Sequence, residues 1–190
     1  MVDFVIINPA ELVERKVITG LINRQKQIQM VSVDLTVADI QRPLSRALLT
    51  EEERHLPLFE SIRPEKDNIY RLDSGCYTVI FNEGIEVPEG LAAFIIQRSS
   101  MNRSLATITA SVIDPGYKAE HLGASLYIQN PHGICIEKNC RVATIYFVKS
   151  RPAKKYDGYY QNEKISLFSG NKAHKSMETK SNFPTLGSFS

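Results

Sequence analysis

Short apolar and β-branched runs, separated by turn sequences, dominate the chain from residue 69 onward. The runs that predict strands are Cys76–Phe81, Ala92–Ile96, Ser125–Ile128, Ile134–Ile136 and Val142–Val148. Glycine, proline and asparagine cluster between them, as in Asn130-Pro131-His132-Gly133, and such clusters are typical of turns. Many short strands without intervening helices predict a mostly β fold, a sandwich or a barrel, and argue against a parallel α/β sheet.

The first third of the chain has a different pattern. Asn8 can cap a helix, Pro9 suits its first turn, and apolar residues recur at helical spacing behind them. We therefore expect a short N-terminal helix over Pro9–Leu21. The segment Gln41–Asn68 is charged and interrupted by prolines. It predicts a long excursion over the surface, with a brief helical turn at Glu51–Glu53.

Composition and charge narrow the class of protein. The 190 residues, 43% hydrophobic and 23% charged, fit one globular domain with a single core. With 23 basic and 21 acidic side chains, the chain lacks the basic surplus of a duplex-binding domain, so we expect no nucleic-acid partner. No apolar run approaches the roughly 20 residues of a membrane helix, and the N-terminus lacks a basic signal region. We expect a cytoplasmic protein without a membrane partner.

Known nucleotide and metal motifs do not explain this sequence. Neither G-x-G-x-x-G nor G-x-x-x-x-G-K-[ST] occurs, so the common dinucleotide and P-loop sites are not expected. Cys76, Cys135 and Cys140 are an odd number of cysteines without the C-x2-C spacing of a zinc site. We expect reduced cysteines in the core or in strands, and no metal ligands from the protein.

Two polar segments carry candidate chemistry. Arg98, Ser99, Ser100 and Arg103 follow an apolar strand directly. Hydroxyls and guanidiniums gathered at a strand end suit an oxyanion such as a phosphate. The second segment, Val112–Tyr117, places one carboxylate, Asp114, in a tight turn before an aromatic ring. In isolation, an aspartate in a turn is most often a structural cap.

Four segments taken in order resemble the successive motifs of the dCTP deaminase and trimeric dUTPase superfamily. They are Ser32-Val33-Asp34-Leu35, Arg98-Ser99-Ser100, Val112-Ile113-Asp114-Pro115-Gly116-Tyr117 and Arg141-Val142-Ala143-Thr144-Ile145-Tyr146-Phe147. The similarity runs from about Leu12 to Ser166. It implies a distorted β-barrel or jelly-roll that assembles as a homotrimer, with active sites between subunits. We expect a dUTPase-like β domain at 1–168 and a flexible polar tail at 169–190.

The resemblance also implies roles for individual residues. Asp114 matches the carboxylate that activates water for attack on a phosphate, and Tyr117 the ring packed under the deoxyribose. Arg98, Ser99 and Ser100 match the phosphate-contacting motif. The ligand would be a pyrimidine deoxynucleoside triphosphate. The cofactor would be Mg²⁺, held mainly by the oxygens of the triphosphate.

Two further segments are similar to the deaminase branch and extend this set. Met101-Asn102-Arg103 and Lys155-Tyr156-Asp157-Gly158-Tyr159-Tyr160-Gln161 carry this likeness. They add Arg103, Tyr156 and Gln161 as nucleotide-binding residues. Tyr159 and Glu163 stand where the deaminase pattern favours Lys and Gln.

A departure from the deaminase pattern decides the expected activity. Tyr127 occupies the position of the deaminase glutamate base, and a phenol with a pKa near 10 is a poor base at neutral pH. We therefore expect hydrolysis of dUTP to dUMP and pyrophosphate, although Thr144 replaces a glutamine of the dUTPase pattern. One alternative is a dCTP deaminase or a bifunctional enzyme, with Glu120 as base from the loop before Gly123; another is a degenerate member that binds a nucleotide or protein without turnover.

Overall fold

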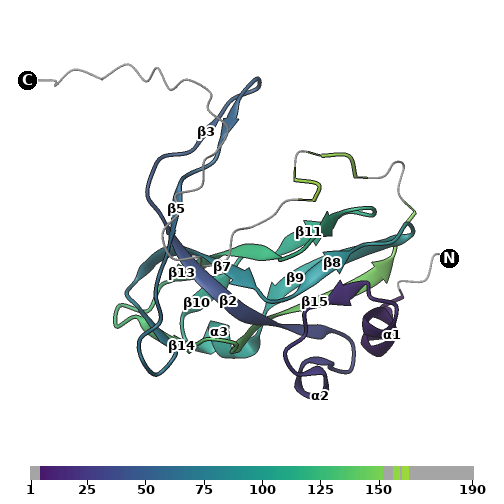
Figure 1. Ribbon diagram of the computed structural model, residues 1–190, viewed down its shortest axis with the longest axis horizontal. Helices are drawn as coiled ribbons and strands as arrows, with labels where there is room; N and C mark the ends of the chain where they lie inside the picture. Colours follow the sequence, from purple (N-terminus) through teal and green to yellow (C-terminus); the bar gives the residue numbers. More distant parts are fainter. Residues whose placement is uncertain (1–4, 152–155, 159, 163–190) are drawn as a thin grey trace, which may run out of the picture.

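Antiparallel strands are the main secondary structure of the computed structural model, which describes residues 5–151, 156–158 and 160–162 (Figure 1). The tail predicted at 169–190 lies outside these residues, as do Tyr159 and Glu163.

The main sheet contains eight strands. They are β2 (Val33–Pro43), β5 (Phe59–Ser61), β7 (Gly75–Phe81), β9 (Leu91–Gln97), β10 (Ala106–Ile108), β11 (Ser111–Ile113), β13 (Gly123–Ile128) and β15 (Arg141–Lys149). Their order is β10-β13-β7-β2-β15-β9-β11, and β5 pairs with β2 off this path. All these pairings are antiparallel, and the five strands predicted from the sequence are confirmed within one or two residues at each end.

Shorter elements flank the main sheet. A second sheet joins β1 (Ile18–Thr19), β8 (Gly84–Glu86) and β12 (Lys118–Ala119), and two strand pairs join β6 (Ile69–Leu72) to β14 (Ile134–Glu137) and β3 (Leu48–Leu49) to β4 (Arg54–His55). The helices are α1 (Pro9–Glu14), α2 (Arg24–Gln27) and α3 (Ser99–Arg103).

The main sheet curls around one core, which gives the distorted barrel that the sequence predicts. Register shifts in β2 and β15 mark bulges, which increase strand twist. The curl brings β10, the first strand in this order, close to β9, the sixth. The Ile108 amide of β10 donates to Gln97 Oε1 of β9 at 2.7 Å. Large apolar side chains fill the interior, among them Leu35, Phe81 and Phe147.

The N-terminal helix is shorter than predicted. Asn8 Oδ1 caps it by accepting from the Ala10 amide at 3.0 Å, as its sequence suggests. It ends at Glu14 because Lys16 adopts a left-handed backbone with φ of 58°. Ile18 then enters the core as a strand residue paired with Ile85. Tertiary pairing therefore overrides the helical spacing of the apolar residues after Glu14.

The predicted excursion is a projecting β-hairpin, which we call the arm and define as Pro43–Phe59 (Figure 1). The helical turn predicted at Glu51–Glu53 is wrong. These residues form the bend between β3 and β4, which the Thr50 amide closes by donating to the Glu53 carbonyl at 2.8 Å. Cross-strand pairing at Leu48 with His55 uses the main-chain groups that a helical turn would need.

The cysteines lie in or beside strands but not in the core. Cys76 is in β7, Cys135 is in β14 and Cys140 directly precedes β15, and all three are free and exposed. The prediction of reduced cysteines in strands is confirmed for Cys76 and Cys135, and their side chains lie on the solvent side because side chains alternate between the two faces of a strand. No helix of the described residues is long and apolar enough to cross a membrane.

The turn before β14 requires glycine at position 133. Gly133 has φ of +73°, and an added Cβ would lie 2.2 Å from the Leu72 carbonyl oxygen. Gly90 has φ of +86°, but its nearest atom would be 3.9 Å away. We expect Gly133→Ala to lower the free energy of unfolding by about 3 kcal/mol and Gly90→Ala by about 1 kcal/mol in urea titrations. Equal losses would contradict the backbone contact.

Candidate active site

A cavity of about 220 Å³ opens beside the end of β11. Its lining comes from β9, β11, the following turn, the chain entering β13, and the two residues Tyr156 and Tyr160. The lining residues are Ile95, Ser111, Val112, Ile113, Asp114, Tyr117, Leu122, Gly123, Tyr156 and Tyr160. Apolar walls with one carboxylate and three phenols suit a small ring-containing ligand with a few polar groups.

The turn after β11 presents Asp114 to this cavity. The Tyr117 amide closes the turn by donating to the main-chain oxygen of Asp114 at 3.2 Å. The Gly116 amide and the Tyr117 carbonyl both bond to Val87 at 2.9 Å, which ties the turn to the barrel. Among the described residues, these main-chain hydrogen bonds close the turn without using the Asp114 carboxylate, which is exposed.

Tyr156 and Gln161 contact the same turn. The Tyr156 amide donates to the Pro115 carbonyl at 2.9 Å, and the rings of Tyr117 and Tyr156 meet edge to face with centroids 5.3 Å apart. Gln161 Nε2 donates to the Gly116 carbonyl at 2.7 Å, and its Oε1 accepts from the Lys118 amide at 3.1 Å. The structure thus brings together four of the predicted site residues, although they are far apart in the sequence.

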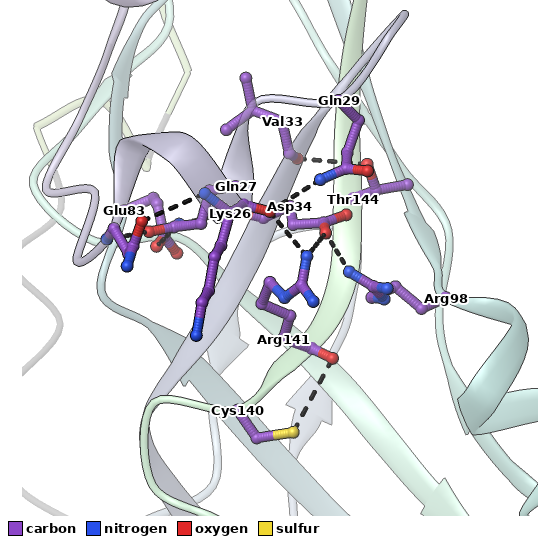
Figure 2. A network of polar contacts seen from close by, with 11 residues as sticks. Lys26, Gln27, Gln29, Val33, Asp34, Glu83, Arg98, Cys140, Arg141 and Thr144 are labelled. Carbon is purple, nitrogen blue, oxygen red and sulfur yellow. Dashed lines mark hydrogen bonds and ion pairs between the residues drawn. The ribbon is translucent and has the colours of Figure 1, made fainter.

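Arg98 belongs to a different cluster, built around Asp34 (Figure 2). Asp34 is buried at the start of β2, and its Oδ2 accepts from Nη1 of Arg98 and from Nη1 of Arg141, the latter at 3.0 Å. Arg141 Nη1 also donates to the Lys26 carbonyl at 2.6 Å. We refer to Asp34, Arg98 and Arg141 as the arginine cluster.

The roles of Asp34 and Arg141 were not predicted from the sequence, although both residues lie within the motifs that carry the family resemblance. A charged residue in the otherwise apolar run Val33–Leu35 is the signal that indicates a buried ion pair.

The arginine cluster carries excess positive charge. Two guanidiniums share one carboxylate, and the side chains of Arg98 and Arg141 are 29% and 35% exposed. Burial raises the pKa of Asp34 above its ordinary 3.8, while attraction to both arginines opposes this shift. Because the arginines reach solvent, the uncompensated charge is accessible to an anion.

A buried polar bridge fixes the strand that carries Asp34. Gln27 Nε2 donates to the Asp34 carbonyl at 2.9 Å and to Glu83 Oε1 at 2.6 Å. Glu83 Oε2 also accepts from the Thr36 amide at 2.9 Å. Burial raises the pKa of Glu83, whereas these hydrogen bonds lower it. The bridge holds the main chain on both sides of Leu35.

The remaining predicted phosphate-binding residues lie beside the arginine cluster. Ser99, Ser100 and Arg103 belong to α3, which begins directly after Arg98, and all three are exposed. The hydroxyls and the extra guanidinium therefore occupy the same end of β9 as the cluster.

Asp114 and Arg98 lie at opposite ends of β9. The antiparallel register places Ile113, which precedes Asp114, opposite Ala93. Arg98 follows Ala93 by five residues, which is about 17 Å along a strand. The structure therefore does not unite the predicted site within one chain. One part of the predicted site is the cavity that contains Asp114, which we call the Asp114 half. The other part is the positively charged cluster that contains Arg98, which we call the Arg98 half.

Neither proposed deaminase base lines the cavity. Glu120 is exposed in the loop after β12 and is not among the lining residues. Tyr127 is 40% exposed on β13, whereas its neighbours Leu126 and Ile128 are buried. Strand alternation therefore turns Tyr127 to the outer face of the sheet, four residues from the cavity residue Gly123.

The donor set around the cavity does not form a metal cage. The described residues hold no group of three or more His, Cys, Asp or Glu side chains that could bind a metal ion. A divalent ion carried by the phosphates of a ligand would be part of that ligand, with phosphate oxygens as its main donors.

Comparisons with known proteins identify relatives of this chain. A family model described as dCTP deaminase-like matches residues 9–150. A deoxyuridine 5'-triphosphate nucleotidohydrolase of Methanocaldococcus jannaschii is 37% identical over 143 residues, covering 72% of this chain and 88% of that protein. A probable deoxyuridine 5'-triphosphate nucleotidohydrolase of Aeropyrum pernix is 33% identical over 138 residues, covering 72% of this chain and 86% of that protein.

The fold also has a solved counterpart. A 2'-deoxycytidine 5'-triphosphate deaminase from Agrobacterium tumefaciens superposes with a TM-score of 0.62 at 16% identity. The match covers 77% of this chain and 49% of the deaminase, so this chain spans about half the length of that protein. At this identity, the likeness establishes the fold alone.

Proposed function

Since this chain belongs to the dCTP deaminase-like family, we propose that it hydrolyses dUTP to dUMP and pyrophosphate. The relatives from M. jannaschii and A. pernix carry the name of this activity and match about nine tenths of their own length. The observation that supports it most directly is the Asp114 carboxylate, held by a main-chain turn at the mouth of an aromatic cavity.

In the proposed reaction, Asp114 acts as the general base. It accepts a proton from a water molecule whose oxygen bonds to the α-phosphorus, while the bond from that phosphorus to the oxygen bridging to the β-phosphate breaks. The electron pair of the broken bond leaves with pyrophosphate. The cavity beside Tyr117 and Tyr156 would hold the nucleoside, with the Tyr117 ring against the deoxyribose.

The triphosphate requires cations that the Asp114 half does not supply. In our proposal, Arg98, Ser99, Ser100 and Arg103 bind its oxygens, and Mg²⁺ arrives as the complex of the triphosphate. Gln161 fixes the turn through the Gly116 carbonyl and the Lys118 amide and so completes the nucleoside side of the site.

We propose a homotrimer in which each site joins the Asp114 half of one subunit to the Arg98 half of its neighbour. The separation of about 17 Å along β9 exceeds what one nucleophilic water and one phosphate group can bridge. A cyclic head-to-tail arrangement would bring unlike ends together and would close after a fixed number of copies.

Mixing two inactive variants tests the shared site. Asp114→Asn and Arg98→Ala subunits should each be inactive as homotrimers. Co-refolded in equal amounts, they should recover about one quarter of the parental dUTP hydrolysis, because one in four interfaces combines two intact halves. Light scattering of each variant controls for loss of the trimer. If intact trimers regain no activity on mixing, each chain carries a whole site.

The activity itself is tested by incubation with each deoxynucleoside triphosphate and magnesium, with pyrophosphate and the base assayed separately. We expect pyrophosphate from dUTP and no uracil nucleotide from dCTP, because neither Tyr127 nor Glu120 lines the cavity. Tyr127→Glu provides the matched variant, since it restores a carboxylate at the deaminase position. Uracil nucleotides formed by the parent, and lost in Glu120→Gln, would instead assign deamination to the loop.

A further inference from the structure

The arm exposes an unusual share of apolar side chains. Six of the fourteen exposed large hydrophobic residues in the described part of the chain lie on these seventeen residues. Their exposed fractions are 59% for Leu44, 36% for Leu48, 68% for Leu49, 47% for Leu56, 54% for Leu58 and 43% for Phe59. Apolar side chains gathered on one projecting element favour an interaction site, because the largest exposed apolar surface of a soluble protein is often functional.

The arm is held by its own two strands. The Leu44 amide donates to the Leu58 carbonyl at 2.7 Å, and the Leu58 amide donates to Ser45 Oγ at 2.8 Å. At its base, Arg42 pairs with Glu60 at 2.6 Å. Among the described residues, the hydrogen bonds and ion pairs of the arm stay within the arm and its base. A two-stranded hairpin without a covered apolar face is marginally stable in water, so a surface that covers the apolar side chains would stabilise the part of the arm beyond β2 and β5.

We propose that the arm is a subunit-docking element that packs on a neighbouring copy of this chain. This inference rests on the proposed function in one respect: the divided site at the two ends of β9 requires a second copy. In a closed ring, the arm of each subunit packs on the next subunit, so the apolar side chains of every arm are covered.

The area of the arm fits this role. The six side chains together expose on the order of 500 Å², which is comparable with the largest apolar patch of a typical monomer. Covering them on a surface of equal size would bury about 1,000 Å², the area at which specific interfaces begin.

The charge of the arm argues against a membrane as the occupant. Arg46 and Arg54 are opposed by the acidic run Glu51–Glu53, so the arm has no basic excess to attract anionic headgroups. Its apolar residues lie in short strands and in the segments that connect them, and they do not form one face of an amphipathic helix.

Charging the arm tests its role in assembly. The double variant Leu49→Lys with Leu58→Lys should shift the mass in light scattering from three subunits to the 21.4 kDa monomer. The subunit concentration at half-dissociation should rise about 100-fold or more. Met30→Lys is the matched control, since Met30 is 95% exposed outside the arm, and it should remain trimeric. An unchanged trimer in the double variant, or a monomeric parent, would overturn the proposal.

A second measurement does not depend on the folding of charged variants. A photo-crosslinking amino acid placed at Leu49 of the full chain should give a covalent dimer on irradiation, with peptides of a second copy attached. Trimers that yield only crosslinks within one chain would refute docking by the arm. Arm-dependent sedimentation with phosphatidylcholine and phosphatidylserine vesicles, without any effect on the trimer, would also refute it in favour of a lipid surface. If arm-dependent trimers form but do not hydrolyse dUTP, the proposed function fails and the docking role stands.

Discussion

Replacing Asp114 by asparagine is expected to lower the rate of dUTP hydrolysis by 10²-fold or more. The amide has nearly the same shape as the carboxylate, but it cannot accept the proton of the attacking water. Nucleotide binding should stay close to parental, because the cavity walls are unchanged. Single-turnover kinetics with dUTP and magnesium, combined with a binding titration using a non-hydrolysable analogue, separate the two effects.

The alternative role for Asp114 is a structural cap of the turn. That role predicts a lower melting temperature in Asp114→Asn and little change in turnover by the molecules that remain folded. The turn is closed by the main-chain oxygen of Asp114, so we expect the melting temperature to be retained. Glu120→Gln is the control, since Glu120 is a nearby exposed carboxylate outside the cavity lining, and it should hydrolyse dUTP at the parental rate.

Asp34→Asn is expected to reduce both stability and catalysis. The variant leaves two guanidiniums side by side without the carboxylate that neutralises one of them. Removing one partner of a buried pair costs about 3 kcal/mol in unfolding free energy. Loss of the anchor for Arg98 should lower kcat/KM for dUTP on the order of 10²-fold, because misplacement of a phosphate ligand by about 1 Å has such an effect.

Asp34 is a positioning residue in this proposal, so its test must separate positioning from folding. Kinetics below the melting transition should show the loss, and raised salt should reduce it, since screening weakens repulsion between Arg98 and Arg141. Asp67→Asn is the matched control because Asp67 pairs with Arg71 on the surface, and its variant should melt close to the parent. Parental stability in Asp34→Asn would show that the arginine cluster contributes nothing to the fold.

The strands and the turn at Asp114 could be predicted from the sequence because neighbouring residues specify them. Alternation and turn residues specify elements such as Cys76–Phe81 over a few positions, and the turn before Tyr117 is indicated by its own residues Asp114-Pro115-Gly116. Such local patterns gave the wrong element where pairing with a distant part of the chain decides the secondary structure. Leu12, Val13, Val17 and Leu21 have helical spacing, but the pairing of Ile18 with Ile85 of β8 makes this part of the chain a strand.

By itself, the sequence determined the fold class, the family resemblance and the identity of the candidate residues, because these depend on residue types and their order. Only the tertiary structure decided how those residues are grouped. Antiparallel pairing of β9 with β11 places Asp114 and Arg98 at opposite ends of one strand, and burial of Asp34 turns Arg98 toward Arg141. The reason is physical: spacing along a chain records which side chains are available, whereas strand register and burial set the distances between them.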